Sequence, residues 1–296
     1  MGRLFQLFVV SVLVLLASRF FFKNKKVESE VNTLPVELNG DRNSDVMIIF
    51  LHGYPNTFRM WDKLIDDLKH NYFCVNLSYP NFAEGVYREW GMDLVDIVDL
   101  IKKTVDTIEQ SEKKTYKKMV VAHDWGAVFT YLLDSKYPKF ADNLLTLDIG
   151  AKLDTSLKTR IFAISYQVYL AANFLIGGEI GRLGTNLFVD KFAKPYGLTK
   201  EDQARIDSSW NYLYYYLWKG ILYYRKTLEN YTPSVPIGYI YGKNKTFMFH
   251  NDEFISYLNA TKGCEVHAVD EGHWVMNKNF DKVLSVIKSR VRSLKK

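Results

Sequence analysis

An aspartate, Asp124, stands where a buried-strand pattern changes into a helical one. The run Met119–Ala122 is short and apolar, as in a buried strand, and Ala127–Tyr137 has the periodicity of a helix. A sharp turn between a strand and a helix holds one side chain in the open, and Gly126 supplies the small residue that this tight backbone needs. A carboxylate held there can displace a leaving group from saturated carbon and form an alkyl ester. The simpler interpretation, in which Asp124 only caps the helix, is disfavoured by the neighbouring motifs.

The first of these motifs, His52-Gly53-Tyr54-Pro55, directly follows the apolar run Val46–Leu51. In a site of this kind one backbone N–H comes from the loop after such a strand, and another comes from the residue after the nucleophile. The sequence therefore predicts an oxyanion hole made by the N–H groups of Tyr54 and Trp125. We also expect Pro55 to contact the substrate.

Hydrolysis of the alkyl ester needs a base, and His273 is the histidine best placed to serve. It follows the apolar run Val266–Val269, and a histidine in the loop after the last strand can activate water. Of the other histidines, His52 and His123 belong to the motifs above, and His267 lies within a strand pattern. We therefore predict His273 as the general base.

An acid should orient His273 and fix its tautomer. The residues just after the run Ile237–Tyr241 contain no carboxylate, but Asp148 ends the run Leu144–Asp148. We predict Asp148 as the orienting acid, with Asp252 as the alternative. A turn or cap ahead of the next segment is the other interpretation of Asp148.

Six short apolar runs alternate with amphipathic stretches along the chain. This alternation predicts a mainly parallel, doubly wound sheet, with the functional residues at the carboxyl ends of its strands. The predicted strands are Val46–Leu51, Tyr72–Leu77, Met119–Ala122, Leu144–Asp148, Ile237–Tyr241 and Val266–Val269.

One segment, from about 155 to 231, interrupts the alternation. It is rich in Tyr, Leu and Trp, contains the run WNYLYYYLWKGILYYR and predicts several helices. Aromatic residues at helical spacing usually form core packing. Here they fall where a helical lid would cover the carboxyl ends of the strands. We therefore predict a lid inserted after the sixth strand of the sheet, in a count that takes Val46–Leu51 as the third strand and Leu144–Asp148 as the sixth.

The N-terminal residues 1–26 combine an apolar run, Leu4–Phe22, with a basic flank. The run is long enough to cross a bilayer, so we predict a single-pass anchor; a cleaved signal peptide and secretion form the weaker interpretation. The positive charge after the run places the catalytic domain on the cytosolic side of a membrane such as the endoplasmic reticulum. Residues 27–45 are polar and predict a linker, which leaves 46–296 as the folded domain.

The composition fits one globular domain. With 296 residues, 48% hydrophobic and 24% charged, the chain can form one sizeable core and is not predicted to be disordered. Cys74 and Cys264 lie in strand patterns and are predicted core residues. The formal net charge is +6, but no nucleic-acid-binding motif accompanies it, so nucleic acid is not an expected partner. The last helical pattern is expected to be a solvated helix end and carries the basic residues Lys288, Arg290, Arg292, Lys295 and Lys296.

Taken together, HGYP and HDWG resemble the motifs of the epoxide hydrolases, a family of the α/β-hydrolases, over about residues 46–290. The haloalkane dehalogenases are similar at the nucleophile but usually carry asparagine where this chain has Tyr54. Three features depart from the family: NLSYPNFAEG lacks its glycine-rich turn, no acid follows the run Ile237–Tyr241, and the lid between Gly177 and Trp218 has no close match.

The resemblance implies two lid tyrosines that protonate the opening epoxide. Tyr166, in Ser165-Tyr166-Gln167-Val168, is similar to the first, and Tyr224, in Leu222-Tyr223-Tyr224-Arg225, is similar to the second. Gln167 is expected to contact the substrate beside Tyr166.

The resulting hypothesis is hydrolysis of a lipophilic epoxide to a vicinal diol through an aspartyl ester, with no metal or organic cofactor. The lipophilic substrate is expected from the apolar lid and the anchor. Two alternatives stay open: a haloalkane dehalogenase using the same aspartate, and a membrane-anchored protein that keeps the fold without turnover. A lipase or esterase is disfavoured because no Gly-X-Ser-X-Gly turn is present. The sequence leaves the oligomeric state open.

Overall fold

The computed structural model describes residues 28–154, 156–193, 198, 200–245 and 247–295. The predicted anchor, residues 1–26, lies outside this part of the chain. Within the described ranges, no helix is both long enough and apolar enough to cross a bilayer.

The centre of the fold is a seven-stranded sheet in the order β1-β3-β2-β4-β5-β6-β7. Strand β1 is antiparallel to β3, and every other neighbouring pair is parallel. All six predicted strands are confirmed, with ends shifted by a residue or two. The strands are β1 Val36–Gly40, β2 Val46–Leu51, β3 Phe73–Leu77, β4 Lys117–His123, β5 Asn143–Leu147, β6 Ile237–Gly242 and β7 Glu265–Val269.

Strand β1 corrects the prediction that residues 27–45 form a linker. Val36 pairs with Leu77 and Gly40 with Phe73, so β1 covers the outer edge of β3. The run VELNG is short and only half-buried, as an edge strand is, and it lacks the continuous apolar run that identifies the central strands. With β1 counted, the strand before the inserted helices is the fifth described one rather than the predicted sixth.

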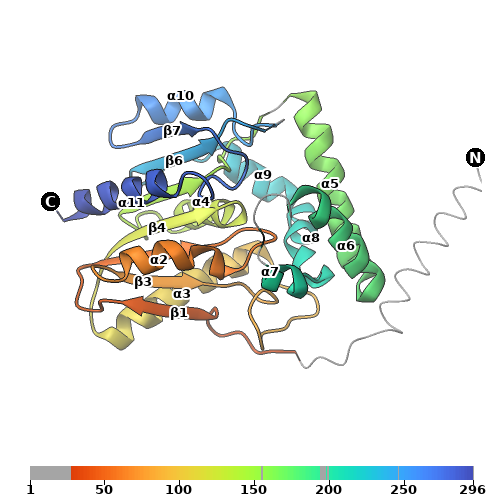
Figure 1. Ribbon diagram of the computed structural model, residues 1–296, viewed down its shortest axis with the longest axis horizontal. Helices are drawn as coiled ribbons and strands as arrows, with labels where there is room; N and C mark the ends of the chain where they lie inside the picture. Colours follow the sequence, from red (N-terminus) through yellow and green to blue (C-terminus); the bar gives the residue numbers. More distant parts are fainter. Residues whose placement is uncertain (1–27, 155, 194–197, 199, 246, 296) are drawn as a thin grey trace, which may run out of the picture.

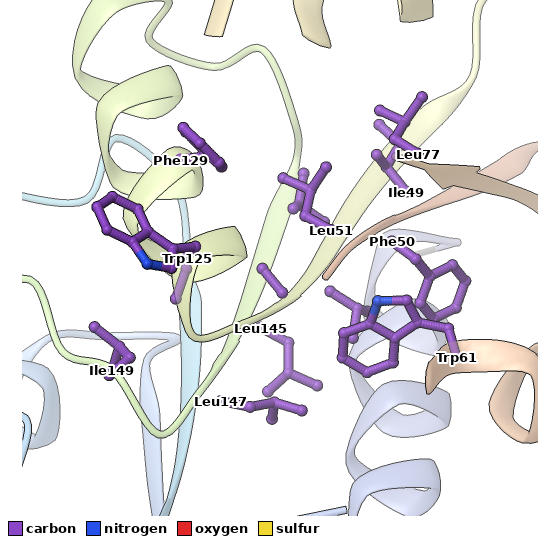
Figure 2. Packing of buried hydrophobic residues seen from close by; sticks show 14 of the residues in the cluster. Ile49, Phe50, Leu51, Trp61, Leu77, Trp125, Phe129, Leu145, Leu147 and Ile149 are labelled. Carbon is purple, nitrogen blue, oxygen red and sulfur yellow. The ribbon is translucent and has the colours of Figure 1, made fainter. Parts of the chain in front are cut away.

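Helices cover both faces of the sheet, which is why β2, β3 and β5 are buried along their whole length (Figure 1). On one face Phe50 of β2 packs against Trp61, with ring centroids 5.6 Å apart, while Ile49 and Leu51 point to the other face (Figure 2). The Trp61 face carries α2 Asp62–Leu68 and α11 Phe280–Leu294, and the other carries α3 Leu94–Glu112, α4 Trp125–Lys136 and α10 Asp252–Ala260.

The segment predicted as a lid is a group of helices between β5 and β6, at the opposite end of the molecule from the C-terminus (Figure 1). Within it, α5 packs against α6 and α8. The helices are α5 Leu157–Ile176, α6 Gly178–Phe192, α7 Lys200–Arg205, the 3-10 turn η3 Ser208–Asn211, α8 Tyr212–Lys219 and α9 Ile221–Glu229.

Candidate active site

Asp124 occupies the turn between β4 and α4 in a backbone conformation that side chains rarely adopt, with φ 51° and ψ −117°. Its carboxylate accepts a hydrogen bond from the Tyr54 N–H, with 2.7 Å between N and Oδ2, rather than capping α4. The geometry therefore disfavours the capping interpretation and places the side chain at the carboxyl end of β4, in the middle of the sheet.

Two glycines make this turn possible. A Cβ on Gly53 would lie 2.4 Å from the Asp124 Cβ, and a Cβ on Gly126 would lie 2.2 Å from the Leu51 carbonyl oxygen. Both distances are too short for a Cβ contact. The atom near Gly53 belongs to a short side chain and the atom near Gly126 to the backbone, so neither can move aside. The glycines of HGYP and HDWG are thus required by the close approach of the two loops.

The predicted oxyanion-hole residues lie on either side of the carboxylate. The N–H of Tyr54 already holds Oδ2, the oxygen on which charge would develop. Trp125, the first residue of α4, follows Asp124 directly, and its backbone role stays a prediction. The hydroxyl of Tyr54 points elsewhere, donating to Asn211 Oδ1 at 2.8 Å.

The predicted base and acid come together with the nucleophile. His273 Nε2 lies 3.5 Å from Asp124 Oδ1, and His273 Nδ1 lies 2.6 Å from Asp148 Oδ2. Asp148 is fully buried and stands at the carboxyl end of β5, in the left-handed region with φ 69°. The alternative acid, Asp252, is an exposed residue at the start of α10. Asp148 is therefore the carboxylate that the fold delivers to His273.

Electrostatics couple the three groups. Burial alone would lower the pKa of His273, but the hydrogen bonds and charges of Asp124 and Asp148 outweigh it and raise the pKa to about 9. Burial alone would raise the pKa of Asp124, but the hydrogen bond and charge of His273 and the Tyr54 N–H hold it below its ordinary value. The resting site is thus an ionised carboxylate beside a protonated imidazole at neutral pH.

Of the two predicted lid tyrosines, one is at the site. Tyr166 of α5 is close enough for the Asp124 charge to act on its phenol, and burial, together with that charge, raises its pKa to about 12. Tyr224 of α9 instead donates a hydrogen bond to Asp93, the N-cap of α3. The structure therefore does not bring Tyr224 to Asp124.

A different tyrosine, Tyr214, lies beside Tyr166. The ring of Tyr214, in α8, meets the rings of Tyr54 and Trp125 edge-on at 5.2 Å each, and that of Tyr166 at 5.9 Å. Burial raises its pKa well above 10, with further contributions from Tyr166 and the Asp124 charge. Tyr214 lies in a run of consecutive aromatic residues, NYLYYYLW, where the sequence alone does not single out one tyrosine.

No protein-family model matches the chain, but parts of it are similar in sequence to known proteins. Epoxide hydrolase 1 of Caenorhabditis elegans is 28% identical over 104 residues, and epoxide hydrolase 4 of Homo sapiens is 25% identical over 112 residues. These alignments cover 35% and 37% of this chain but only 25% and 29% of the relatives, so the chain matches under a third of their length.

Solved structures resemble the whole described fold. Bacillus megaterium epoxide hydrolase, solved with an inhibitor, gives a TM-score of 0.64 at 18% identity, over 88% of this chain and 96% of that one. A haloalkane dehalogenase loop variant from Bradyrhizobium elkanii also gives 0.64, at 13% identity, over 88% and 93%. The chain has the fold of the α/β-hydrolases, and part of it is similar in sequence to the epoxide hydrolases. Because the two solved proteins carry different names on one fold, the choice of activity depends on the residues of the site.

The buried acid, Asp148, has a partner that sequence reasoning missed. Lys245, in the loop after β6, donates a hydrogen bond to Asp148 Oδ1, and the Gly242 N–H donates to the same oxygen at 2.9 Å. Burial lowers the pKa of Lys245, and the charge of Asp148 opposes that shift. Lys245 lies in the loop after β6, where the sequence has no acid. A basic residue in that loop is the sequence signal that could have indicated a partner for Asp148.

The remaining predicted residues flank the candidate site. Pro55 is buried and joined to Tyr54 by a cis peptide bond. Gln167 lies on α5, with its Nε2 3.5 Å from the Tyr166 hydroxyl, and contact with substrate stays a prediction for both. Burial lowers the pKa of His52 and of His123 to about 4, so both are neutral supports for the loops that carry Tyr54 and Asp124.

Proposed function

We propose that this α/β-hydrolase converts an epoxide to a vicinal diol through a covalent ester on Asp124. The observation that carries the proposal is the nucleophile itself, an aspartate in contact with the Tyr54 N–H and His273, whose charge also acts on Tyr166 and Tyr214. A carboxylate nucleophile suits substitution at saturated carbon, whereas acyl transfer commonly uses the hydroxyl of Ser or Thr or the thiol of Cys.

In the first step, Asp124 Oδ1 attacks one epoxide carbon while Oδ2 stays on the Tyr54 N–H. The new O–C bond forms as the C–O bond of the ring breaks, and the departing oxygen takes a proton from a phenol. Tyr166 and Tyr214 supply that proton and polarise the ring oxygen beforehand. Their raised pKa values keep both hydroxyls protonated at neutral pH, as a proton donor requires.

In the second step, water attacks the Cγ of the Asp124 ester and gives a proton to His273 Nε2. Negative charge develops on Oδ2, already held by the Tyr54 N–H, and the predicted Trp125 N–H would add to this stabilisation. Collapse of the tetrahedral intermediate breaks the Cγ–Oδ1 bond, and the departing oxygen takes the proton held by His273, which releases the diol. The proton left on the new Asp124 carboxyl group restores the phenol that was ionised in the first step. Asp148 keeps the His273 tautomer in which Nδ1 carries the proton and Nε2 is free to act.

Two observations disfavour the alternatives. The absence of an acid after β6 was the best support for a protein without turnover, but Asp148 lies 2.6 Å from His273 and fills that role. A dehalogenase needs donors for halide, and the side chain at the HGYP position, Tyr54, donates its hydroxyl to Asn211 instead.

The test is diol formation from a panel of aromatic and fatty-acid epoxides by the full chain. Asp124→Ala should abolish diol formation, while Asp270→Ala, at an exposed carboxylate paired with Lys243, should leave it unchanged. In a single turnover in isotopically labelled water, the label should enter Asp124 and not the diol. No diol from any epoxide, together with halide release from haloalkanes, would transfer the assignment to a dehalogenase.

A lipophilic substrate and membrane attachment belong to the same proposal. Beside Tyr166, the rings of Phe162 and Phe188 lie at 5.4 and 5.8 Å, which supports an apolar substrate-binding wall. Residues 1–26 would anchor the protein with its catalytic domain in the cytosol. Alkaline extraction and protease protection of microsomes test the anchor and its orientation: a soluble or protease-protected catalytic domain would contradict them.

A further inference from the structure

The outer face of α5 is apolar and open to solvent. Leu157, Ile161, Ile164 and Val168 recur at intervals of four, three and four residues, which places them on one side of the helix. Their exposed fractions run from 48% to 74%. Single exposed leucines are ordinary, but a continuous stripe of this kind marks a surface that something else covers.

The opposite side of α5 is already buried against the rest of the protein. Leu170 and Phe174 are inaccessible there, and the ring of Phe174 packs against Tyr215 of α8 at 5.3 Å. A helix that is apolar on both sides is normally covered on both sides. The stripe is therefore not needed to hold α5 in place, and its exposure requires another explanation.

Helix α6 extends the stripe into a broad surface. Ile180, Leu183 and Leu187 recur at intervals of three and four and are each 58% or more exposed. The two helices are joined at Tyr169, whose hydroxyl donates to the Gly184 carbonyl, and at Phe192, whose ring meets Phe162 at 6.2 Å. The α5–α6 face consists of Leu157, Ile161, Ile164, Val168, Tyr169, Ile180, Leu183, Leu187 and Phe192.

Basic residues exceed acidic ones on these two helices. Helix α5 has no acidic residue in its 20 positions and carries two basic ones, both exposed. Helix α6 adds two of each sign. The basic residues are Lys158, Arg160, Arg182 and Lys191, and the acidic ones are Glu179 and Asp190. An apolar face with a positive border matches a phospholipid surface, where apolar side chains enter the acyl boundary and cations meet anionic headgroups.

The described chain begins at this end of the molecule. The Ser29 N–H donates to the Tyr87 carbonyl, and Asn81, in the same loop, donates to the Ser209 carbonyl of the inserted helices. Figure 1 shows this first segment at the end of the molecule that carries α5 and α6, with the C-terminus at the other end. The 27 residues before it include the apolar run Leu4–Phe22. A chain tethered through that run would hold α5 and α6 toward the bilayer.

We propose that the α5–α6 face lies on a phospholipid bilayer, in the interfacial region, with the inserted helices between the membrane and the catalytic carboxylate. This surface goes beyond the anchor and does not depend on the epoxide chemistry. Tyr166 lies on the inner side of the same helix, α5, so a lipophilic substrate dissolved in the membrane would meet the site without crossing bulk water.

The experiment uses the full chain in nanodiscs of phosphatidylcholine and phosphatidylserine. In a Cys264→Ser background, with buried Cys74 kept, single cysteines at Ile164 and Leu187 receive an environment-sensitive fluorophore. Tyr257, exposed on α10 and outside the α5–α6 face, is the matched control. Both α5–α6 labels should shift to the blue and be quenched by lipids with spin labels near the headgroup, and the control should do neither.

Labels at both positions that emit as in water would overturn the proposal. Labels that are shielded but not quenched, with cross-linking between copies at Ile164, would assign the face to a second copy instead. A Leu183→Glu and Leu187→Glu double variant gives an independent check: with an unchanged melting temperature, it should lose most quenching at Ile164. Its diol formation from a water-soluble epoxide should stay at the wild-type rate, which separates failure of this surface from failure of the proposed activity.

Discussion

At the scale of single residues, the site is built by loops that the sequence identifies and by a tyrosine that it does not. Asp124, Asp148 and His273 follow different strands, and strand ends are readable from apolar runs. The tyrosines lie on helices whose rotation and packing depend on tertiary contacts. With 20 tyrosines in the chain, a local motif did not distinguish the one that packs beside Tyr166.

The first prediction compares Tyr214 with Tyr224. Tyr214→Phe should slow the alkylation step on the order of 10²-fold, because one of two proton donors is lost. Tyr224→Phe should leave that step within about twofold and cost about 1–2 kcal/mol of stability, because its hydroxyl only serves Asp93. Rapid-mixing kinetics and chemical denaturation measure the two effects. Lost turnover in Tyr224→Phe at unchanged stability would restore the assignment made from the motif.

The second prediction concerns His273, which must be neutral to take a proton from water. In the resting protein Asp124 and Asp148 raise its pKa to about 9. Esterification removes the Asp124 charge, and Lys245 offsets that of Asp148, so the pKa should fall once the ester forms. The rate of ester hydrolysis should therefore rise with pH as His273 loses its proton and become constant above an apparent pKa. That apparent pKa should be lower than the pKa of His273 in the resting protein. Nuclear magnetic resonance titration and single-turnover rates supply the two values, and equal values would contradict the argument.

At the scale of elements, α11 shows how a sequence pattern can hide a structural residue. Its basic cluster was expected to be solvated, yet Arg290 is only 5% exposed. Its Nε donates to Asn143 Oδ1 at 2.6 Å and its Nη1 to Glu265 Oε1 at 2.8 Å. The guanidinium thus ties α11 to the starts of β5 and β7. Charge composition alone does not show which basic residue of a helix is buried and which are exposed.

Arg290→Met should therefore lower the free energy of unfolding by about 3 kcal/mol, because Asn143 and Glu265 lose their buried partner. Arg292→Met, at an exposed position of the same helix, should change it by less than about 0.5 kcal/mol. Denaturant titrations of both variants give the comparison. Similar values for the two would mean that the Arg290 contacts contribute no net stability.

At the scale of the whole molecule, the sequence predicted the doubly wound sheet, its six parallel strands and the inserted helices, because continuous apolar runs that alternate with helical patterns are signals spread over the whole chain. The sequence analysis missed one of the two edge strands, β1. Strand β1 was assigned to a linker, since an edge strand with one polar side resembles an irregular polar segment. Lys245 and Tyr214 were missed for a related reason. Their partners, Asp148 and Tyr166, are far away in the sequence, so the contacts exist only in the folded chain.

The edge strand gives the last prediction. A chain beginning at residue 46 would follow the domain boundary read from the sequence, yet it would expose the edge of β3, whose five residues are all buried in the fold. It would also lose the Leu34 N–H donated to Thr104 of α3. An unpaired, apolar strand edge is a template for aggregation. We expect a chain beginning at residue 28 to be soluble and cooperative in thermal unfolding, and one beginning at residue 46 to aggregate, as light scattering would report. Equal solubility and melting temperature would show that β1 is dispensable and that the fold is complete from β2 onward.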